Sequence, residues 1–462
     1  MRRILVLLIF FGTSTICSQK NNLMLPLEEY LGLVKKNHPI VKQARLIITE
    51  SEIKLLKARG AFDPKVNLAV NRKIFKGLEY YSTLKSTFKI PTWYGIELKA
   101  KYENNEGTYL NPALNTPTNG LYSAGISIPL AKGLLINDRM ATLKQAQLYQ
   151  NQAQAKQEQI VNDILFNASK AYFNWLKKYQ EKLVYQEYLI NAETRLSNLK
   201  KSFSNGDKAA IDTLEAHINV NNRLLDKEKI QIDYVKSTLE LSNFLWLDDD
   251  IPLELKPSMH PDVATNIKLD AVLINSILAN HNEIINAHPK IRELNSKKEV
   301  LVVNQKLKQN NLLPAIDFEY NFLTSGFDKM NSFNVENFQT GLRLNFPLFL
   351  RKERAELRLA KQKIQDIDFD ISSSKVLLLN KIRGLSQEIA SYKRQHILLI
   401  DLVKDYKKFV SSEERKFNLG EGSLFLVNYR EVKFIESQLK EIQAAYNLFL
   451  SKSKLLRTLA TL

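Results

Sequence analysis

Few residues in this sequence have the types and spacing that chemistry requires. The histidines include no pair at the helical i,i+4 spacing with which two imidazoles bind one zinc ion. The segment Gly420-Glu421-Gly422-Ser423 is rich in glycine, but it lacks the lysine and the preceding strand of a phosphate-binding loop. Neither a nucleophile elbow nor a catalytic pair of carboxylates is recognisable, so we predict no enzymatic activity, no metal site and no cofactor. The histidines are His38, His217, His260, His281, His288 and His396.

Composition excludes several other classes of protein. The chain has 462 residues, of which 44% are hydrophobic and 25% charged, with few Gly and Pro, so it is neither disordered nor collagen-like. A single cysteine excludes a disulfide scaffold or a Cys-rich zinc site. The formal charge is +17, but Lys and Arg are interspersed with Asp and Glu, so we expect no nucleic-acid partner.

The N-terminus has the layout of a secretory signal peptide. Arg2 and Arg3 precede an apolar run over residues 4–11, which is too short to span a bilayer and is followed by small polar residues. We expect cleavage after Ser18, which would export the mature chain. The single cysteine, Cys17, leaves open a lipoprotein signal, although the bulky Ile16 before it is unusual for one.

The rest of the sequence contains two copies of an internal repeat. Each copy contains a helix, a strand region between two prolines, a very long helix, a glycine turn and a long return helix. The first repeat covers residues 19–247, with barrel strands at about 64–129 and a helical hairpin at about 133–247. A linker, 248–266, contains Asp248–Asp250 and precedes the second repeat, 267–462, with strands at about 314–347 and a hairpin at about 351–461. The matching landmarks are His38-Pro39 with His288-Pro289, Pro64 with Pro314, Pro129 with Pro347, and Gly206 with Gly420.

The strand regions alternate apolar and polar residues. Ile316, Phe318 and Tyr320 alternate with Asp317 and Glu319, a period of two that places the two kinds of side chain on opposite faces. Such strands suit a barrel wall between lipid and water. The four prolines that bound the strand regions, Pro64, Pro129, Pro314 and Pro347, are the predicted barrel-to-helix transitions.

The helical regions have the spacing of coiled coils. No proline lies between Pro129 and Gly206, and a helix of nearly 70 residues there would be on the order of 100 Å long. In the last helix, apolar residues with one serine follow a 3,4 spacing, which predicts an elongated bundle of paired helices. These seam residues are Val432, Ile435, Leu439, Ile442, Tyr446, Phe449, Ser453, Leu456 and Ala460.

One chain cannot close a barrel of this kind. Two strand pairs give four strands, fewer than the eight of the smallest membrane barrels, and open edges in lipid leave backbone groups unpaired. We therefore expect the chain to oligomerise, and three copies would give 12 strands and 12 helices in closed walls.

The ordered set of landmarks resembles the TolC-like outer-membrane efflux family over nearly all of the mature chain. The secretory start, the duplicated His-Pro elements, Ile128-Pro129-Leu130 with Phe346-Pro347-Leu348, and the Phe-x-x-Gly turns carry the resemblance. It implies a mainly α fold with a transmembrane β-barrel portion, in which a trimeric barrel continues into an α-helical periplasmic tunnel. It also implies outer-membrane lipid around the barrel, a periplasmic adaptor protein, and an inner-membrane RND or ABC pump.

The resemblance further implies that the two glycine turns form the periplasmic mouth and contact the adaptor. These residues are Ser204, Asn205, Gly206, Asp207, Asn418, Leu419, Gly420 and Glu421. Family members carry acidic residues after the second turn, where this chain has Leu426 and Tyr429. The first half keeps Asp212 and Glu215 at the equivalent positions, on one helix face. They are a candidate cation-selectivity ring, and solvated helix-face charges are the simpler interpretation.

The first strand region is longer than the second, and two interpretations of the excess stay open. Residues 82–90 and 94–102 alternate as an additional strand pair would, which predicts a larger barrel. Alternatively, residues 103–120 form a long extracellular loop on a 12-strand barrel.

The predicted function is the exit duct of a tripartite efflux or type I secretion system, located in the outer membrane of a Gram-negative-type cell. The duct would conduct substrates passively from the pump and the adaptor to the exterior. The rival hypothesis is a soluble periplasmic coiled-coil scaffold or adaptor, in which the strands would pack as a soluble sandwich instead of facing lipid.

Overall fold

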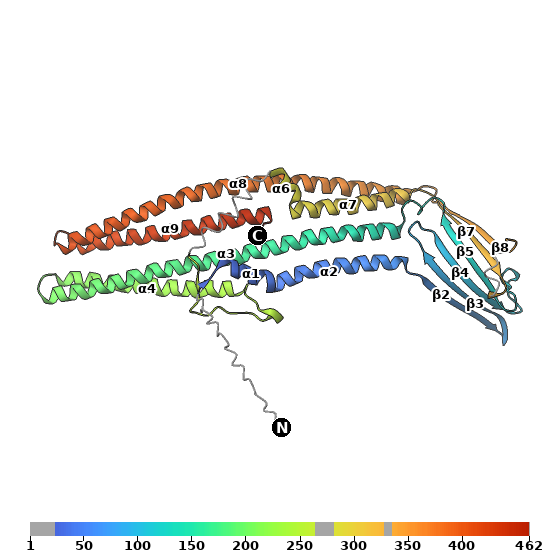
Figure 1. Ribbon diagram of the computed structural model, residues 1–462, viewed down its shortest axis with the longest axis horizontal. Coiled ribbons are helices and arrows are strands. Elements are labelled where there is room, and N and C mark those ends of the chain that lie inside the picture. The colour runs from blue at the N-terminus through green and yellow to red at the C-terminus, as the bar shows by residue number, and fades with distance from the viewer. Residues whose placement is uncertain (1–23, 264–280, 328–334, 462) are drawn as a thin grey trace, which may run out of the picture. The chain divides into compact units, whose positions relative to one another are not determined.

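The computed structural model describes residues 24–263, 281–327 and 335–461. These residues are mostly helical, with one large antiparallel sheet (Figure 1). The helical unit contains residues within Met1–Val34, Ala168–Leu269 and His396–Tyr446, and the sheet unit contains residues within Lys35–Asn167, Asp270–Gln395 and Asn447–Leu462. The predicted signal peptide and Cys17 lie outside the described residues.

Two long helical hairpins dominate the described chain. In the first, α3 (Asp138–Ser204) turns into α4 (Ala210–Ser242), and in the second, α8 (Arg351–Asn418) turns into α9 (Leu424–Leu459). None of the described helices is both long enough and apolar enough to cross a membrane. The other helices are α1 (Leu27–Asn37), α2 (Pro39–Arg59), α6 (His281–Ala287) and α7 (Pro289–Asn310), with 3-10 turns η1 (Gly60–Phe62), η2 (Pro112–Leu114) and η3 (Asp248–Asp250).

The large sheet has six strands, in the order β2-β3-β4-β5-β7-β8, and all neighbours are antiparallel. Of the two interpretations left open for the first strand region, the additional strand pair is therefore the one observed, and the sheet has six strands instead of four. The excess in the first half forms a complete hairpin, β3 and β4, because its residues alternate in the same way as those of the other strands. Only residues 107–120 remain as a loop between β4 and β5. The strands are β2 (Lys65–Phe75), β3 (Leu78–Pro91), β4 (Glu97–Glu106), β5 (Leu121–Pro129), β7 (Ala315–Thr324) and β8 (Phe338–Asn345).

The register gives the sheet one polar and one apolar face. Residues directly opposite each other in an antiparallel pair lie on the same face. Lys89 is opposite Lys99 and Asp317 is opposite Arg343 on the polar face, whereas Ile316 is opposite Leu344 on the apolar face. The edge strands β2 and β8 are exposed at every residue, including Val66 at 70% and Leu342 at 69%.

The turn between β3 and β4 is anchored to the start of α3. Asn137 caps this helix by accepting a hydrogen bond from the backbone N–H of Met140 at 2.9 Å, and its Nδ2 donates to the carbonyl of Trp93 at 3.0 Å. A side chain at Gly95 would come within 2.8 Å of the Gly133 carbonyl oxygen, so the turn requires glycine there. The additional hairpin is thus fixed to the helix below it.

In the helical unit, α3 and α9 lie between α4 and α8 (Figure 1). The seam predicted on α9 is buried in part, since Ile435 and Ile442 are 4% and 7% exposed, whereas Val432 at its start is 37% exposed. A two-stranded parallel sheet of β1 (Met24–Leu25) and β6 (His260–Pro261) completes this unit. Neighbouring helices are bonded by Lys178 to Asp233 at 3.0 Å, Tyr188 to Gln438 at 2.8 Å and His396 to Glu441 at 3.0 Å.

The duplicated His-Pro elements are helix N-caps. His38 precedes Pro39 at the start of α2, and its Nδ1 accepts the backbone N–H of Ile40 at 3.2 Å. His288 accepts the N–H of Lys290 at 3.0 Å in the same way at the start of α7. Since Nδ1 can accept only when it carries no proton, both caps require neutral imidazole. Burial lowers the pKa of both histidines.

We expect these caps to make stability depend on pH. A folded-state pKa below the usual 6.5 means that the unfolded chain binds protons more readily. The stabilisation is therefore present above about pH 6.5 and is lost as the pH falls through the folded-state pKa values. Replacing both residues, His38→Asn and His288→Asn, should keep the caps and flatten the decline of the melting temperature between about pH 7 and 5. An equally steep decline in this variant would contradict the assignment.

Candidate functional site

The two hairpin turns have the same backbone geometry. In the first, the N–H of Gly206 donates to the carbonyl of Phe203 at 3.0 Å, and that of Asp207 donates to the carbonyl of Ser202 at 2.9 Å. This pair of bonds is the Schellman motif, which satisfies the last carbonyls of a helix. In the second turn, Gly420 and Glu421 donate to Phe417 and Lys416 at 3.1 and 3.0 Å. Both glycines have φ of 82°, a left-handed conformation that favours glycine.

An apolar cluster joins the two turns. Phe417 and Leu424 flank the second turn, and they pack with Leu196 and Leu199 of α3 and Ala216 and Val220 of α4. Lys208 of the first turn also lies 4.3 Å from the centre of the Phe417 ring. The structure therefore brings together, at one end of the helical unit, the turn residues predicted from separate halves of the sequence. These are Ser204, Asn205, Gly206, Asp207, Asn418, Leu419, Gly420 and Glu421.

Large apolar side chains are exposed around the two turns. Phe203 is 47% exposed, Leu419 67% and Phe425 65%, although solvation of such groups is unfavourable. Ile211 and Leu214, in the first turns of α4, are 68% and 55% exposed. We call these five residues the turn surface. An exposed apolar patch of this kind is typical of a protein-binding site.

The two candidate selectivity carboxylates point partly into the bundle. Asp212 and Glu215 are both half-buried near the start of α4. Glu215 Oε1 accepts a hydrogen bond from Asn428 Nδ2 of α9 at 2.9 Å, so it is bonded within its own chain. Whether these side chains line a ring stays a prediction, and the hydrogen bond gives Glu215 a structural role.

A buried ionic network crosses all four helices next to this end. Glu431 of α9 is 1% exposed and lies 3.1 Å from Arg195 of α3 and 3.6 Å from Arg223 of α4. Arg195 also binds Glu414 of α8 at 2.8 Å. Burial opposes the charge of Arg195, but Glu431 and Glu414 outweigh it and raise the Arg195 pKa. The network therefore ties the two hairpins together.

The sequence interpretation did not identify this network, although a signal was present. Val427, Glu431 and Phe434 follow the same 3,4 spacing as the buried apolar residues of α9. Val220 and Arg223 do the same on α4. A charged residue at a seam position predicts a buried ion pair, but its partner depends on which helices meet.

The predicted transition prolines all lie at one end of the sheet. Pro64 precedes β2, Pro129 ends β5, Pro314 precedes β7 and Pro347 follows β8. Pro91, which ends β3 in the additional hairpin, lies at the same end and was not predicted. This end is the one at which β5 leads into α3, and the role of the four prolines as barrel-to-helix transitions stays a prediction.

Comparisons with known proteins identify the fold. No model of a known protein family matches the sequence, and no curated protein matches it. Among solved structures, the CmeC outer membrane channel of Campylobacter jejuni matches with a TM-score of 0.65 and 12% identity, over 94% of this chain and 85% of that one. VceC, an outer membrane protein of Vibrio cholerae, matches with a TM-score of 0.65 and 13% identity, over 94% and 96%.

The MtrE outer membrane channel of Neisseria gonorrhoeae, in its open state, matches with a TM-score of 0.66 and 12% identity, over 94% of this chain and 88% of that one. Identities this low establish the fold alone. The helix-and-sheet architecture implied by the resemblance to TolC-like proteins is therefore confirmed. The chain has the fold of these outer-membrane channels.

Proposed function

We propose that this protein is the outer-membrane exit duct of a tripartite efflux or type I secretion system. The observation that carries the proposal is the six-stranded sheet, which has a mainly apolar face and two unpaired edges. Its strands have 8 to 14 residues, and about 9–11 tilted residues cross a bilayer. An apolar face of this length is stable against lipid and unfavourable in water. The rival soluble scaffold would leave this face exposed.

Closure of the sheet requires further copies of the chain. In our proposal, β2 of one copy pairs with β8 of the next, which satisfies the backbone groups that lipid would leave unpaired. Three copies of six strands form an 18-stranded wall in place of the expected 12 strands. Because barrel diameter grows roughly linearly with strand number, this barrel would have about 1.5 times the diameter of a 12-stranded barrel.

The outer helices of the helical unit also have unpartnered apolar faces. On α4, a heptad stripe of exposed residues runs along the helix, and Ile218, Leu225 and Ile232 are 52%, 70% and 56% exposed. On α8, Leu398, Leu402 and Phe409 are exposed with similar spacing. We infer that the α4 stripe of one copy packs on α8 of the next in a homotrimer. Beyond the turn surface, the α4 stripe consists of Ile218, Leu225, Ile232, Val235 and Leu239.

The turn surface is the proposed contact for a periplasmic adaptor. Its exposed Phe203, Leu419 and Phe425 offer apolar area that a helical hairpin of the adaptor can cover. The adaptor in turn binds an inner-membrane RND or ABC pump, which supplies the energy, so that conduction through the duct is passive. The turns would form the periplasmic mouth of the duct.

A substitution in the first turn tests this role. Gly206→Pro removes the N–H that donates to Phe203 and imposes φ near −65° on a residue that has φ of 82°. We expect export to be lost, measured as intracellular accumulation of an exported dye in cells that lack other ducts. Gly77→Pro, in the turn between β2 and β3, has a comparable backbone conflict far from the mouth in sequence and is the control. Unchanged export by a folded Gly206→Pro protein would contradict the proposal.

A further inference from the structure

The polar face of the sheet carries a surplus of positive charge. Up to the register shift after Lys73, residues on this face include seven cations and four carboxylates, a net charge of +3 per chain. The opposite face of the same pairs has apolar residues such as Phe88, Leu98 and Phe318. The cations are Lys65, Lys73, Lys85, Lys89, Lys99, Lys101 and Arg343, and the carboxylates are Glu97, Glu103, Asp317 and Glu319.

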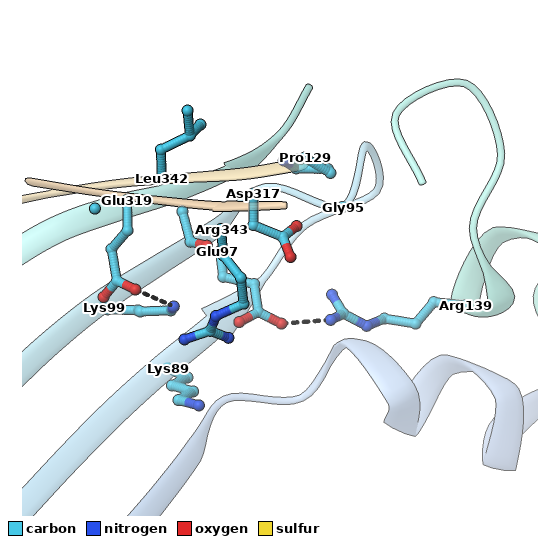
Figure 2. Close-up of a pocket in the computed structure, with 12 residues that line it drawn as sticks. Lys89, Gly95, Glu97, Lys99, Pro129, Arg139, Asp317, Glu319, Leu342 and Arg343 are labelled. Atoms are coloured by element: carbon cyan, nitrogen blue, oxygen red, sulfur yellow. Dashed lines mark hydrogen bonds and ion pairs between the residues drawn. The ribbon is translucent and has the colours of Figure 1, made fainter. Parts of the chain in front are cut away.

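The polar face adjoins the helices at one end of the sheet. A pocket of about 480 Å³ there is lined by Lys89, Lys99, Glu319 and Arg343, whose side chains lie on the same side of the sheet (Figure 2). Glu319 is shared by two lysines, with Lys101 Nζ at 2.9 Å and Lys99 Nζ at 3.5 Å. One carboxylate therefore compensates two cations.

Two further cations in this pocket have no ion-pair partner among the described residues. Lys89 and Arg343 lie beside the pocket, and neither is within ion-pair distance of a carboxylate in the described ranges. Glu97 is bound by Arg139 of α3 at 2.5 Å, and Asp317, the third acid of the pocket, lies opposite Arg343 in the sheet. Two of the three acids are thus engaged, and the pocket as a whole is lined by four cations and three acids.

The additional hairpin supplies much of this charge. Strands β3 and β4 contribute four of the seven cations, Lys85, Lys89, Lys99 and Lys101, and two of the four carboxylates. Without the hairpin, the polar face would carry three cations and two carboxylates, a net charge of +1. The insertion that adds two strands therefore also makes this face more cationic.

We propose that the polar face is an anion-selective lining, through which the duct passes organic anions in preference to cations. This inference rests on the proposed function, in which the apolar face meets lipid and the polar face meets the water of the lumen. Three copies give the lining a charge of about +9, and a low-dielectric wall focuses this potential on the lumen. Lysine and arginine recognise carboxylate, sulfonate and phosphate groups, so the cargo class is organic anions.

Reversal potentials test the proposal. The purified protein is reconstituted in a planar bilayer with a gradient of KCl, and the wild type is expected to be more permeable to chloride than to potassium. Lys89→Glu with Arg343→Glu changes the net charge of the face from +3 to −1 per chain, so the sign of the reversal potential should invert. Lys89→Gln with Arg343→Gln leaves +1, and should reduce the anion preference without inverting it. If the variant with two Glu substitutions does not fold, the variant with two Gln substitutions still tests the proposal.

A control variant distinguishes the effect of charge on the polar face from the effect of the overall charge of the protein. Lys35→Glu with Lys57→Glu makes the same change in charge at exposed positions of α1 and α2, away from the sheet face, and should leave the reversal potential unchanged. Cation preference in the wild type, or equal shifts in the control and the Lys89 and Arg343 variants, would overturn the anion-selective lining alone. Absence of any conductance in the wild type would overturn the proposed duct as well.

Discussion

Replacing Glu431 with Gln is expected to destabilise the folded protein by about 3 kcal/mol or more, because it leaves buried arginines without a compensating charge. Glu431 is 1% exposed and is the carboxylate that Arg195 and Arg223 share. Among the described residues, Arg195 keeps Glu414 at 2.8 Å and Arg223 keeps Asp226 at 3.8 Å. Thermal unfolding of the purified protein, followed by its helical circular dichroism, measures the loss as a lower melting temperature.

The matched control for this substitution is on the same helix. Glu436→Gln removes an ion pair with Lys433. The side chains of Glu436 and Lys433 are 44% and 37% exposed, so this substitution should change the melting temperature little. Adding Arg223→Met to Glu431→Gln should recover part of the loss, since it removes one uncompensated cation. Equal melting temperatures for Glu431→Gln and Glu436→Gln would show that the buried network does not stabilise the bundle.

Charges placed in the α4 stripe are expected to abolish the trimer. Ile218 and Leu225 are 52% and 70% exposed in one chain, so Ile218→Lys with Leu225→Lys should leave the folding of that chain intact. In the proposed assembly the same positions are buried against α8 of the next copy, where an unpaired ammonium is strongly unfavourable. Native mass spectrometry in detergent should show three copies for the wild type and single chains for the double variant.

A neighbouring position on α4 provides the comparison. Asn222→Lys adds a charge at the heptad position that Lys229 occupies one heptad later. This variant should remain a trimer. Trimers in both variants would mean that the stripe is not the interface. Single chains in the wild type would contradict the trimer itself.

The helices, their turns and the strand positions could be predicted because they depend on local sequence. The distance between Pro129 and Gly206 indicated a very long helix, and α3 (Asp138–Ser204) is that helix. Alternation at Ile316, Phe318 and Tyr320 predicted β7. The long helices end just before Gly206 and Gly420, and these ends could be located because left-handed glycine and helix termination are local properties.

Features that depend on distant residues were not predicted. The strand count stayed open because alternation in residues 82–102 fitted a hairpin, while the polar residues after it fitted a loop, and both are present. The bond between Glu215 and Asn428 joins residues more than 200 positions apart, and no spacing along the chain reveals it. The histidines at 38 and 288 were weighed as metal ligands, although the proline after each one is the signal of a helix N-cap.

The central claim, that this chain forms a water-filled duct across the outer membrane, is tested most directly by single-channel recording of the purified protein in a planar lipid bilayer. The account predicts spontaneous insertion and steady conductance steps that persist without any nucleotide or ion gradient beyond the applied voltage. Folded, helical protein that fails to insert, or inserts without conducting, would contradict the duct and favour a soluble periplasmic scaffold.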